Sequence, residues 1–102
     1  MNRVEVTHGA IVDLEWFFSS LGVDAQSIRT SHITVEVIGE RARKTLNNIS
    51  GGVVADIKRG RVKSSIKTVD NPPGVYQVWV TVLKKDRSEA RNLTHTLVAI
   101  DG

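Results

Sequence analysis

The segment 58–67, KRGRVKSSIK, carries five cationic side chains in ten residues. Cations at this density can meet the phosphate groups of nucleic acid, and binding of single strands also needs exposed aromatic rings on which bases stack. Trp79 is the ring expected nearest to these cations. One hypothesis is therefore a small nucleic-acid-binding protein that uses the basic segment 41–67 together with Trp79. Its candidate contact residues are Arg41, Arg43, Lys44, Lys58 and Arg59.

Charged residues are unevenly distributed along the chain. Residues 1–40 contain two arginines against six carboxylates, residues 41–67 contain eight cationic side chains against one carboxylate, and residues 68–102 balance at four of each. Such a distribution can attract an acidic partner, nucleic acid included. It equally suits copies of the chain that pack head to tail, with acidic segment against basic segment. Charge alone leaves both kinds of partner open.

Catalytic chemistry finds little support in the residue pattern. His8, His32 and His95 are far apart in the sequence and there is no cysteine, so a metal site would have to be assembled by the fold alone. Ser65 and His95 could belong to a Ser-His-Asp triad, but no nucleophile-elbow motif accompanies them. No pair of carboxylates is spaced for general acid–base catalysis. We expect a non-enzymatic protein without a metal or cofactor.

The first part of the chain is expected to contain strands and one clear helix. Residues 2–6 alternate weakly and residues 31–39 alternate clearly between apolar and polar, which indicates two strands. In residues 10–21 the apolar side chains fall at helical spacing. Thr7 can cap the start of this helix, and Gly22 lies just past its end.

A second, short helix is expected in residues 40–49. Its outer face would be basic, and the glycine pair 51–52 would end it. The apolar residues that fall at helical spacing are Ala42, Leu46 and Ile49.

After residue 52 the sequence period changes from 3.6 to 2, which indicates strands. Their connections are short enough for hairpins, so an antiparallel meander is predicted. The predicted strands are 53–58, 61–69, 75–85 and 91–100. The sequence therefore predicts an α+β fold, in which two helices pack on one face of a mainly antiparallel sheet ending in a four-strand meander. The 102 residues form a single domain in this interpretation.

Alternation sorts the strand residues into two faces. One face is almost wholly apolar and is expected to be the core beneath the helices. Its residues are Val53, Ala55, Ile57, Val62, Ile66, Tyr76, Val78, Val80, Val82, Val98 and Ile100. The opposite face combines cations on one strand with large apolar side chains on two others. Its candidate binding residues are Arg61, Lys63, Lys67, Trp79, Leu83, Leu93 and Leu97.

This mixed face is typical of a protein-binding surface, with Trp79 as anchor, leucines as the apolar centre and cations as the rim. Its alternative explanation is that residues 1–6 or 23–30 fold over the patch. Protein binding accounts for the leucines and the charge asymmetry together, whereas nucleic-acid binding accounts for the cations alone. We therefore expect an assembly or adaptor subunit that binds a protein partner, with a homo-oligomer favoured and nucleic acid as the alternative partner.

The composition indicates an ordinary soluble protein. Hydrophobic residues make up 40% of the chain, and no segment approaches the roughly 18 consecutive apolar residues that a membrane span needs. The first residues lack the pattern of a signal or transit peptide, and the absence of cysteine excludes a disulfide framework. We expect a cytoplasmic protein without membrane contact.

Overall fold

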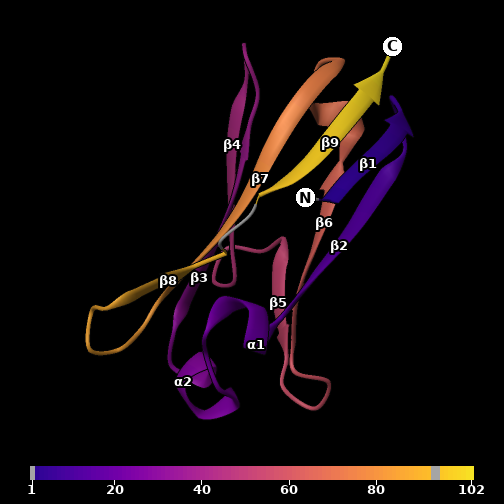
Figure 1. Cartoon of the computed structure of the whole chain (residues 1–102). Helices are drawn as coiled ribbons and strands as arrows, with labels where there is room; N and C mark the ends of the chain where they lie inside the picture. Colours follow the sequence, from indigo (N-terminus) through magenta and orange to yellow (C-terminus); the bar gives the residue numbers. More distant parts are fainter. Residues whose placement is uncertain (1, 93–94) are drawn as a thin grey trace.

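The computed structural model describes residues 2–92 and 95–102, and it is built mainly from strands arranged in two sheets (Figure 1). The larger sheet has the order β1–β9–β7–β3–β4, with β8 also paired to β7, and the smaller sheet has the order β2–β6–β5. The larger sheet contains β1 (Asn2–Thr7), β3 (His32–Ile38), β4 (Arg43–Asn47), β7 (Gly74–Leu83), β8 (Glu89–Arg91) and β9 (Thr96–Asp101). The smaller sheet contains β2 (Ile11–Phe17), β5 (Val53–Asp56) and β6 (Arg61–Lys67).

The predicted α+β fold, with helices covering a sheet, is wrong. The helices α1 (Phe18–Leu21) and α2 (Ala25–Arg29) are short and lie together at one end of the molecule (Figure 1). They bury Phe18, Leu21 and Ile28 at that end. Each sheet buries its apolar face against the other sheet. The second sheet thus provides the covering layer that the two helices were expected to provide. Among the described residues, no helix has the length and apolar character needed to cross a membrane.

The apolar face predicted for the later strands is confirmed as core. Its valines at 62, 78, 80 and 82 are fully buried, whereas Ala55 and Ile57 are partly buried. The same core takes in Val12, Leu14 and Trp16 from β2. Burial of a side chain of this size contributes roughly 1.5–3 kcal/mol, so the contact between the sheets is the main source of stability.

Residues 11–17 form strand β2 and not the predicted helix. The segment fits both periods, because its apolar residues include pairs at helical spacing and also the alternating Val12, Leu14 and Trp16. Alternation prevails because Asp13 and Glu15 then point to solvent while their neighbours enter the core. Pairing along the full length of β6 completes the strand. The predicted stop is confirmed, since Gly22 ends α1 with a left-handed φ of 69°.

The predicted basic helix at 40–49 is also wrong, because this segment contains β4, the edge strand beside β3. The side chain of Asn48 continues the pairing: its Oδ1 accepts a hydrogen bond of 2.9 Å from the N–H of Ile33. Gly51 and Gly52 have φ values of 119° and 92° and turn the chain toward β5, and they do not cap a helix. Only three apolar residues at helical spacing favoured the helix, and the pairing of β4 with β3 outweighs so weak a pattern.

The predicted four-strand meander is broken between β6 and β7. These strands belong to different sheets, and the 3-10 turn η1 (Thr68–Asp70) begins the connection from one sheet to the other. The predicted strand 91–100 is divided into β8 and β9, which pair with different parts of β7. Between them, Oδ1 of Asn92 accepts a hydrogen bond of 2.9 Å from the N–H of Val80.

Candidate functional site

Trp79 lies in the middle of β7, and its half-buried side chain is on the outer face of the larger sheet. The guanidinium carbon of Arg91, on β8, is 4.2 Å from the centroid of the Trp79 rings. The ring of His95 lies 5.1 Å away and is tilted by 47°. The indole Nε1 donates a hydrogen bond of 3.1 Å to Gln77. Contacts on several sides therefore fix the orientation of the indole.

Glu36 is the register partner of Trp79 on β3 and connects two arginines. Its carboxylate accepts a hydrogen bond from Arg43 on β4, and it lies 4.0 Å from a guanidinium nitrogen of Arg91. The Glu36 side chain is only 19% exposed, so these pairs are less screened by solvent than ordinary surface ion pairs. The arginine that stacks on Trp79 is thereby tied to a third strand.

Apolar side chains surround this cluster. Val75 is 50% exposed and Leu83 is 37% exposed, while Leu97 is half-buried on the neighbouring β9. Leu93, which the sequence assigned to the same patch, lies outside the described residues. We name the outer surface of the larger sheet the Trp79 face. Its central residues are Glu36, Arg43, Val75, Gln77, Trp79, Leu83, Arg91 and Leu97.

A groove of about 300 Å³ lies on the Trp79 face, along β8. It is lined by His32, Thr34, Glu36, Thr81, Leu83, Glu89 and Arg91. Within the described part of the chain, Nε2 of His32 is buried and has no hydrogen-bond partner. A buried polar atom without a partner is unusual. The groove itself presents the polar side chains of Thr34, Thr81 and Glu89 to a partner that enters it.

Arg61, Lys63 and Lys67 do not belong to the Trp79 face. They project from β6 on the outer face of the smaller sheet, which is the opposite side of the two-sheet structure. The single mixed face of cations and leucines, expected from the sequence, is therefore wrong. This expectation failed because the predicted meander placed β6 next to β7. Such pairing would bring the outward side chains of the two strands onto one face.

Carboxylates on β2 and β5 pair with two of these cations, Arg61 and Lys63. Arg61 donates a hydrogen bond of 2.8 Å to Glu15, and Nζ of Lys63 lies 3.8 Å from Glu15 and 3.6 Å from Asp56. The guanidinium of Arg61 also lies 5.1 Å from the ring centroid of Phe17. The acidic and basic segments of the sequence thus meet within one chain, on neighbouring strands.

The cations suggested for nucleic-acid binding are dispersed. Arg43 pairs with Glu36, and Lys44 lines the gap between the sheets. Arg41 lies in the turn between β3 and β4 at one end of the molecule, whereas Lys58 and Arg59 lie in the β5–β6 turn at the opposite end (Figure 1). Among the described residues they form no continuous track that leads to Trp79.

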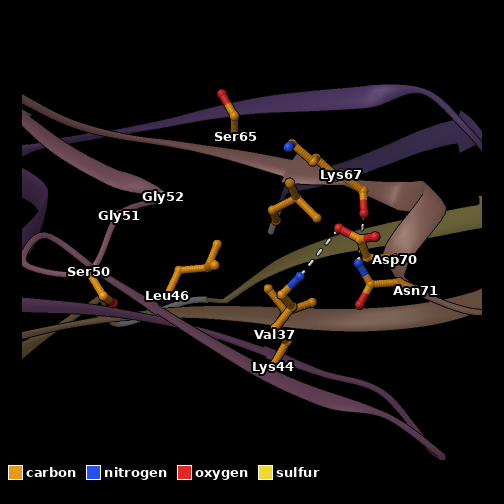
Figure 2. A pocket seen from close by; sticks show the side chains of 11 residues that line it. Val37, Lys44, Leu46, Ser50, Gly51, Gly52, Ser65, Lys67, Asp70 and Asn71 are labelled. Atoms are coloured by element: carbon orange, nitrogen blue, oxygen red, sulfur yellow. Dashed lines mark hydrogen bonds and ion pairs between the residues drawn. The ribbon is translucent and has the colours of Figure 1, made fainter.

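A cavity of about 320 Å³ opens between the edge of β4 and strand β6 (Figure 2). Val37, Leu46 and Ile66 form its apolar wall. Across the cavity, Nζ of Lys44 lies 3.5 Å from a carboxylate oxygen of Asp70 (Figure 2). A charged residue on the inner side of an edge strand discourages pairing with a foreign strand. We therefore interpret this cavity as part of a protected sheet edge, in which Lys44 opposes pairing of β4 with another strand.

The residues considered for catalysis are separated. Ser65 lies on the smaller sheet, where its Oγ donates a hydrogen bond of 2.6 Å to Asp13, whereas His95 lies against Trp79 on the larger sheet. These two residues therefore do not share a site. In the part of the chain that the structure describes, no three His, Cys, Asp or Glu side chains are grouped so that they could hold a metal ion.

Sequence reasoning missed the roles of Arg91 and Glu36. The alternation of Glu36 with Val35 and Val37 already indicated an outward side chain, so its exposure was predictable but its two partners were not. Arg91 reaches Trp79 because the β7–β8 hairpin pairs Thr81 with Arg91. A loop of a different length would move Arg91 along β7, and the loop sequence does not specify this register.

In comparisons with known proteins, no protein-family model matches the chain, and no curated protein is significantly similar to it in sequence. The fold alone does not determine a function. The chemistry of the two sheet surfaces is therefore what indicates a function.

Proposed function

We propose that this protein is a non-enzymatic assembly subunit whose copies bind one another through the Trp79 face. The observation that carries the proposal is the fixed indole of Trp79, stacked by Arg91 among exposed apolar side chains. Tryptophan and arginine at the centre of an apolar patch are the usual hot-spot residues of protein interfaces. A side chain that is already ordered also loses little conformational entropy on binding.

The charge balance of the Trp79 face supports a second copy as the partner. The face carries three arginines and four carboxylates, which are Arg3, Arg43, Arg91, Glu5, Glu36, Glu89 and Asp101. Two nearly neutral faces can approach without net repulsion. In a two-fold contact every favourable contact that one copy makes is made again by the other.

The groove beside Trp79 supplies a polar position within this contact. Hot spots commonly combine an aromatic anchor with a neighbouring pocket that the partner fills. A polar side chain of the second copy that enters the groove would meet Thr34, Thr81 and Glu89. Specificity for the correct partner would then come from these polar contacts.

The same charge balance weighs against nucleic acid on the Trp79 face. Affinity for nucleic acid comes mainly from cations that neutralise phosphates. Here two of the three arginines already contact Glu36, and the third, Arg3, pairs with Glu5. The Trp79 ring already carries the Arg91 guanidinium, and no surplus of positive charge accompanies it.

Molar mass in solution, measured by light scattering during size-exclusion chromatography, tests the proposal. The unchanged protein should form a discrete oligomer at high protein concentration. Val75→Lys places a charge in the Trp79 face at a site that is 50% exposed, so it should weaken self-association at least about tenfold without unfolding the chain.

The matched control is Val54→Lys on the outer face of the smaller sheet, at a site that is 63% exposed. This variant changes the net charge equally and should leave self-association unaltered. A monomer at every concentration would contradict the proposal. Equal weakening by both variants would contradict the assignment to the Trp79 face.

A further inference from the structure

The surplus positive charge of the chain is concentrated at one end of the molecule. The Trp79 face carries three arginines and four carboxylates, and the outer face of the smaller sheet carries three cations and three carboxylates. Arg41 and Lys44 are balanced by Glu40 and Asp70. The side chains that remain are six cations, Arg29, Lys58, Arg59, Lys84, Lys85 and Arg87, and two carboxylates, Asp24 and Asp86. Their surplus of four charges exceeds the net charge of +3 of the whole chain.

This end is formed by the two helices, with the β5–β6 turn on one side of them and the β7–β8 turn on the other, in the lower part of Figure 1. The N–H of Phe18 donates a hydrogen bond of 2.8 Å to the carbonyl of Gly60, which joins α1 to the β5–β6 turn. Ser27 and Thr30 at α2 line a cavity of about 190 Å³ together with Lys84, Lys85 and Asp86 of the β7–β8 turn. We name this end the basic pole, defined by Arg29, Lys58, Arg59, Lys84, Lys85 and Arg87.

The cations of the basic pole are available to a ligand. None of the six forms an ion pair within the described residues, whereas most cations of the two sheet faces do. The two carboxylates at this end, Asp24 and Asp86, accept hydrogen bonds from Ser27 and Ser88, and their charges act on Lys84; they offset two of the six positive charges. The surface charge at this end is therefore mostly uncompensated.

Arg87 supplies an independent indication. Of the non-glycine residues in 2–92 and 95–102, it alone has a positive φ, at 70°. Its N–H donates to the carbonyl of Lys84 and closes the β7–β8 turn. Glycine or asparagine adopts this left-handed conformation at lower cost and would form the same turn. An unfavourable backbone conformation at an exposed arginine points to a function of its side chain.

We propose that the basic pole binds the phosphate backbone of double-helical nucleic acid. This activity is separate from the assembly function of the Trp79 face, and it involves residues that lie at the opposite end from Arg41. Of the cations that the sequence suggested for nucleic acid, only Lys58 and Arg59 belong to the pole.

The chemistry of the pole favours a duplex over other polyanions. A double helix presents about one negative charge per 1.7 Å of its axis, a higher density than a single strand or an extended acidic peptide. The hairpin turns and α2 carry no aromatic side chain, and the exposed ring of Phe17 just before α1 already lies against the guanidinium of Arg61, which leaves it poorly placed to stack unpaired bases. Binding should therefore be independent of base sequence and strongly dependent on salt.

Fluorescence anisotropy with a labelled 20-base-pair duplex, over a series of salt concentrations, tests the proposal. If all six cations contact phosphates, the slope of log affinity against log salt should approach about −5, and affinity should fall about 10³-fold between 50 and 200 mM salt. The variant Lys84→Gln/Lys85→Gln/Arg87→Gly should halve this slope and weaken binding at least about tenfold.

A matched control is Arg61→Gln/Lys63→Gln/Lys67→Gln on the smaller sheet. It removes the same number of charges from a face that is already neutral, so duplex binding should change less than about twofold. The single variant Arg87→Gly separates folding from binding: its melting temperature should rise because the strained conformation is relieved, while its affinity for the duplex should fall.

Three results would overturn the proposal. The first is no duplex binding at 50 mM salt with about 100 μM protein, since even non-specific binding is usually tighter. The second is equal weakening by the pole variant and its control. The third is tighter binding to polyglutamate or to vesicles containing phosphatidylserine than to the duplex, which would assign the pole to an acidic protein or to a membrane surface.

Discussion

Arg91 is in contact with both Trp79 and Glu36: its guanidinium carbon lies 4.2 Å from the Trp79 ring centroid, and a guanidinium nitrogen lies 4.0 Å from the Glu36 carboxylate. These three residues come from β8, β7 and β3. The short strand β8 pairs with β7, and the side chain of Arg91 connects it to β3 as well.

Removal of this attachment should be visible at Trp79. Arg91→Ala should lower the free energy of unfolding by about 0.5–1 kcal/mol, the usual contribution of an exposed cation–π pair. It should also increase acrylamide quenching of tryptophan fluorescence, because the indole loses its cover. Arg3→Ala on the same sheet is the control and should change neither quantity. Unaltered quenching in Arg91→Ala would show that the stacking does not order Trp79.

Thr68 joins the β1–β2 corner to the end of β6. Its fully buried hydroxyl donates a hydrogen bond of 2.6 Å to the carbonyl of Ala10 and accepts one of 2.8 Å from the N–H of Gly9. Thr68→Val keeps the shape but leaves both backbone groups without this partner, so urea unfolding should report a loss of about 1–3 kcal/mol. Thr45→Val on the exposed β4 should stay within about 0.5 kcal/mol. An equally small loss of unfolding free energy in Thr68→Val would show that the Thr68 hydroxyl does not join the β1–β2 corner to β6.

Gly39 is packed against the ring of Tyr76. A β-carbon at this position would overlap Cε2 of that ring. The ring cannot move aside easily, because Tyr76 is buried and its hydroxyl donates to the carbonyl of Pro72. Gly39→Ala should therefore destabilise the fold by about 1–3 kcal/mol through overpacking.

A double-mutant cycle checks the cause. In a Tyr76→Val background the ring is absent, so the added methyl group should cost much less. Equal losses in both backgrounds would mean that the backbone of Gly39, and not the contact with Tyr76, limits the substitution.

Asp24 makes part of the stability depend on pH. Hydrogen bonds from Ser27 lower the pKa of the Asp24 carboxyl below its ordinary value of 3.8. A carboxylate with a lowered pKa in the folded state stabilises the protein above its unfolded pKa, and this contribution is lost as the pH falls through the folded pKa. Asp24→Asn keeps an N-cap acceptor that does not titrate.

The difference in free energy of unfolding between the unchanged protein and Asp24→Asn should therefore shift in favour of the variant between about pH 4 and about pH 2. Urea unfolding at several pH values in this window measures it. A constant difference across the window would show that the pKa of Asp24 is the same in the folded and unfolded states.

The inner face of the later strands could be predicted because alternation is a local property. Val78, Val80 and Val82 are separated by Trp79 and Thr81, and this pattern requires no knowledge of the neighbouring strands. The pairing of β6 could not be predicted in the same way. The residues between β6 and β7 are equally compatible with a hairpin and with a crossing between sheets. Which of the two forms depends on the layer that covers the core, and the local sequence does not show this layer.

For the candidate site, the sequence identified Trp79, Leu83 and Leu97 as outward residues of one face, and the structure agrees in this respect. It could not show that Arg61 belongs to the other sheet, since this depends on the topology. The segment 11–17 illustrates the same limit: once it is a strand and not a helix, its acids come beside the cations of β6, and the opposite charges of these two segments cancel on the smaller sheet.

The central claim, self-association through the Trp79 face, is tested most directly by the two tryptophan indole N–H signals in ¹H–¹⁵N correlation spectra recorded on dilution. Trp16 is buried in the core and Trp79 lies on the proposed contact surface, so one protein contains both the probe and its control. We predict that the Trp79 signal shifts with protein concentration while the Trp16 signal stays constant. A Trp79 signal that is independent of concentration, in a sample that light scattering shows to self-associate, would contradict the claim.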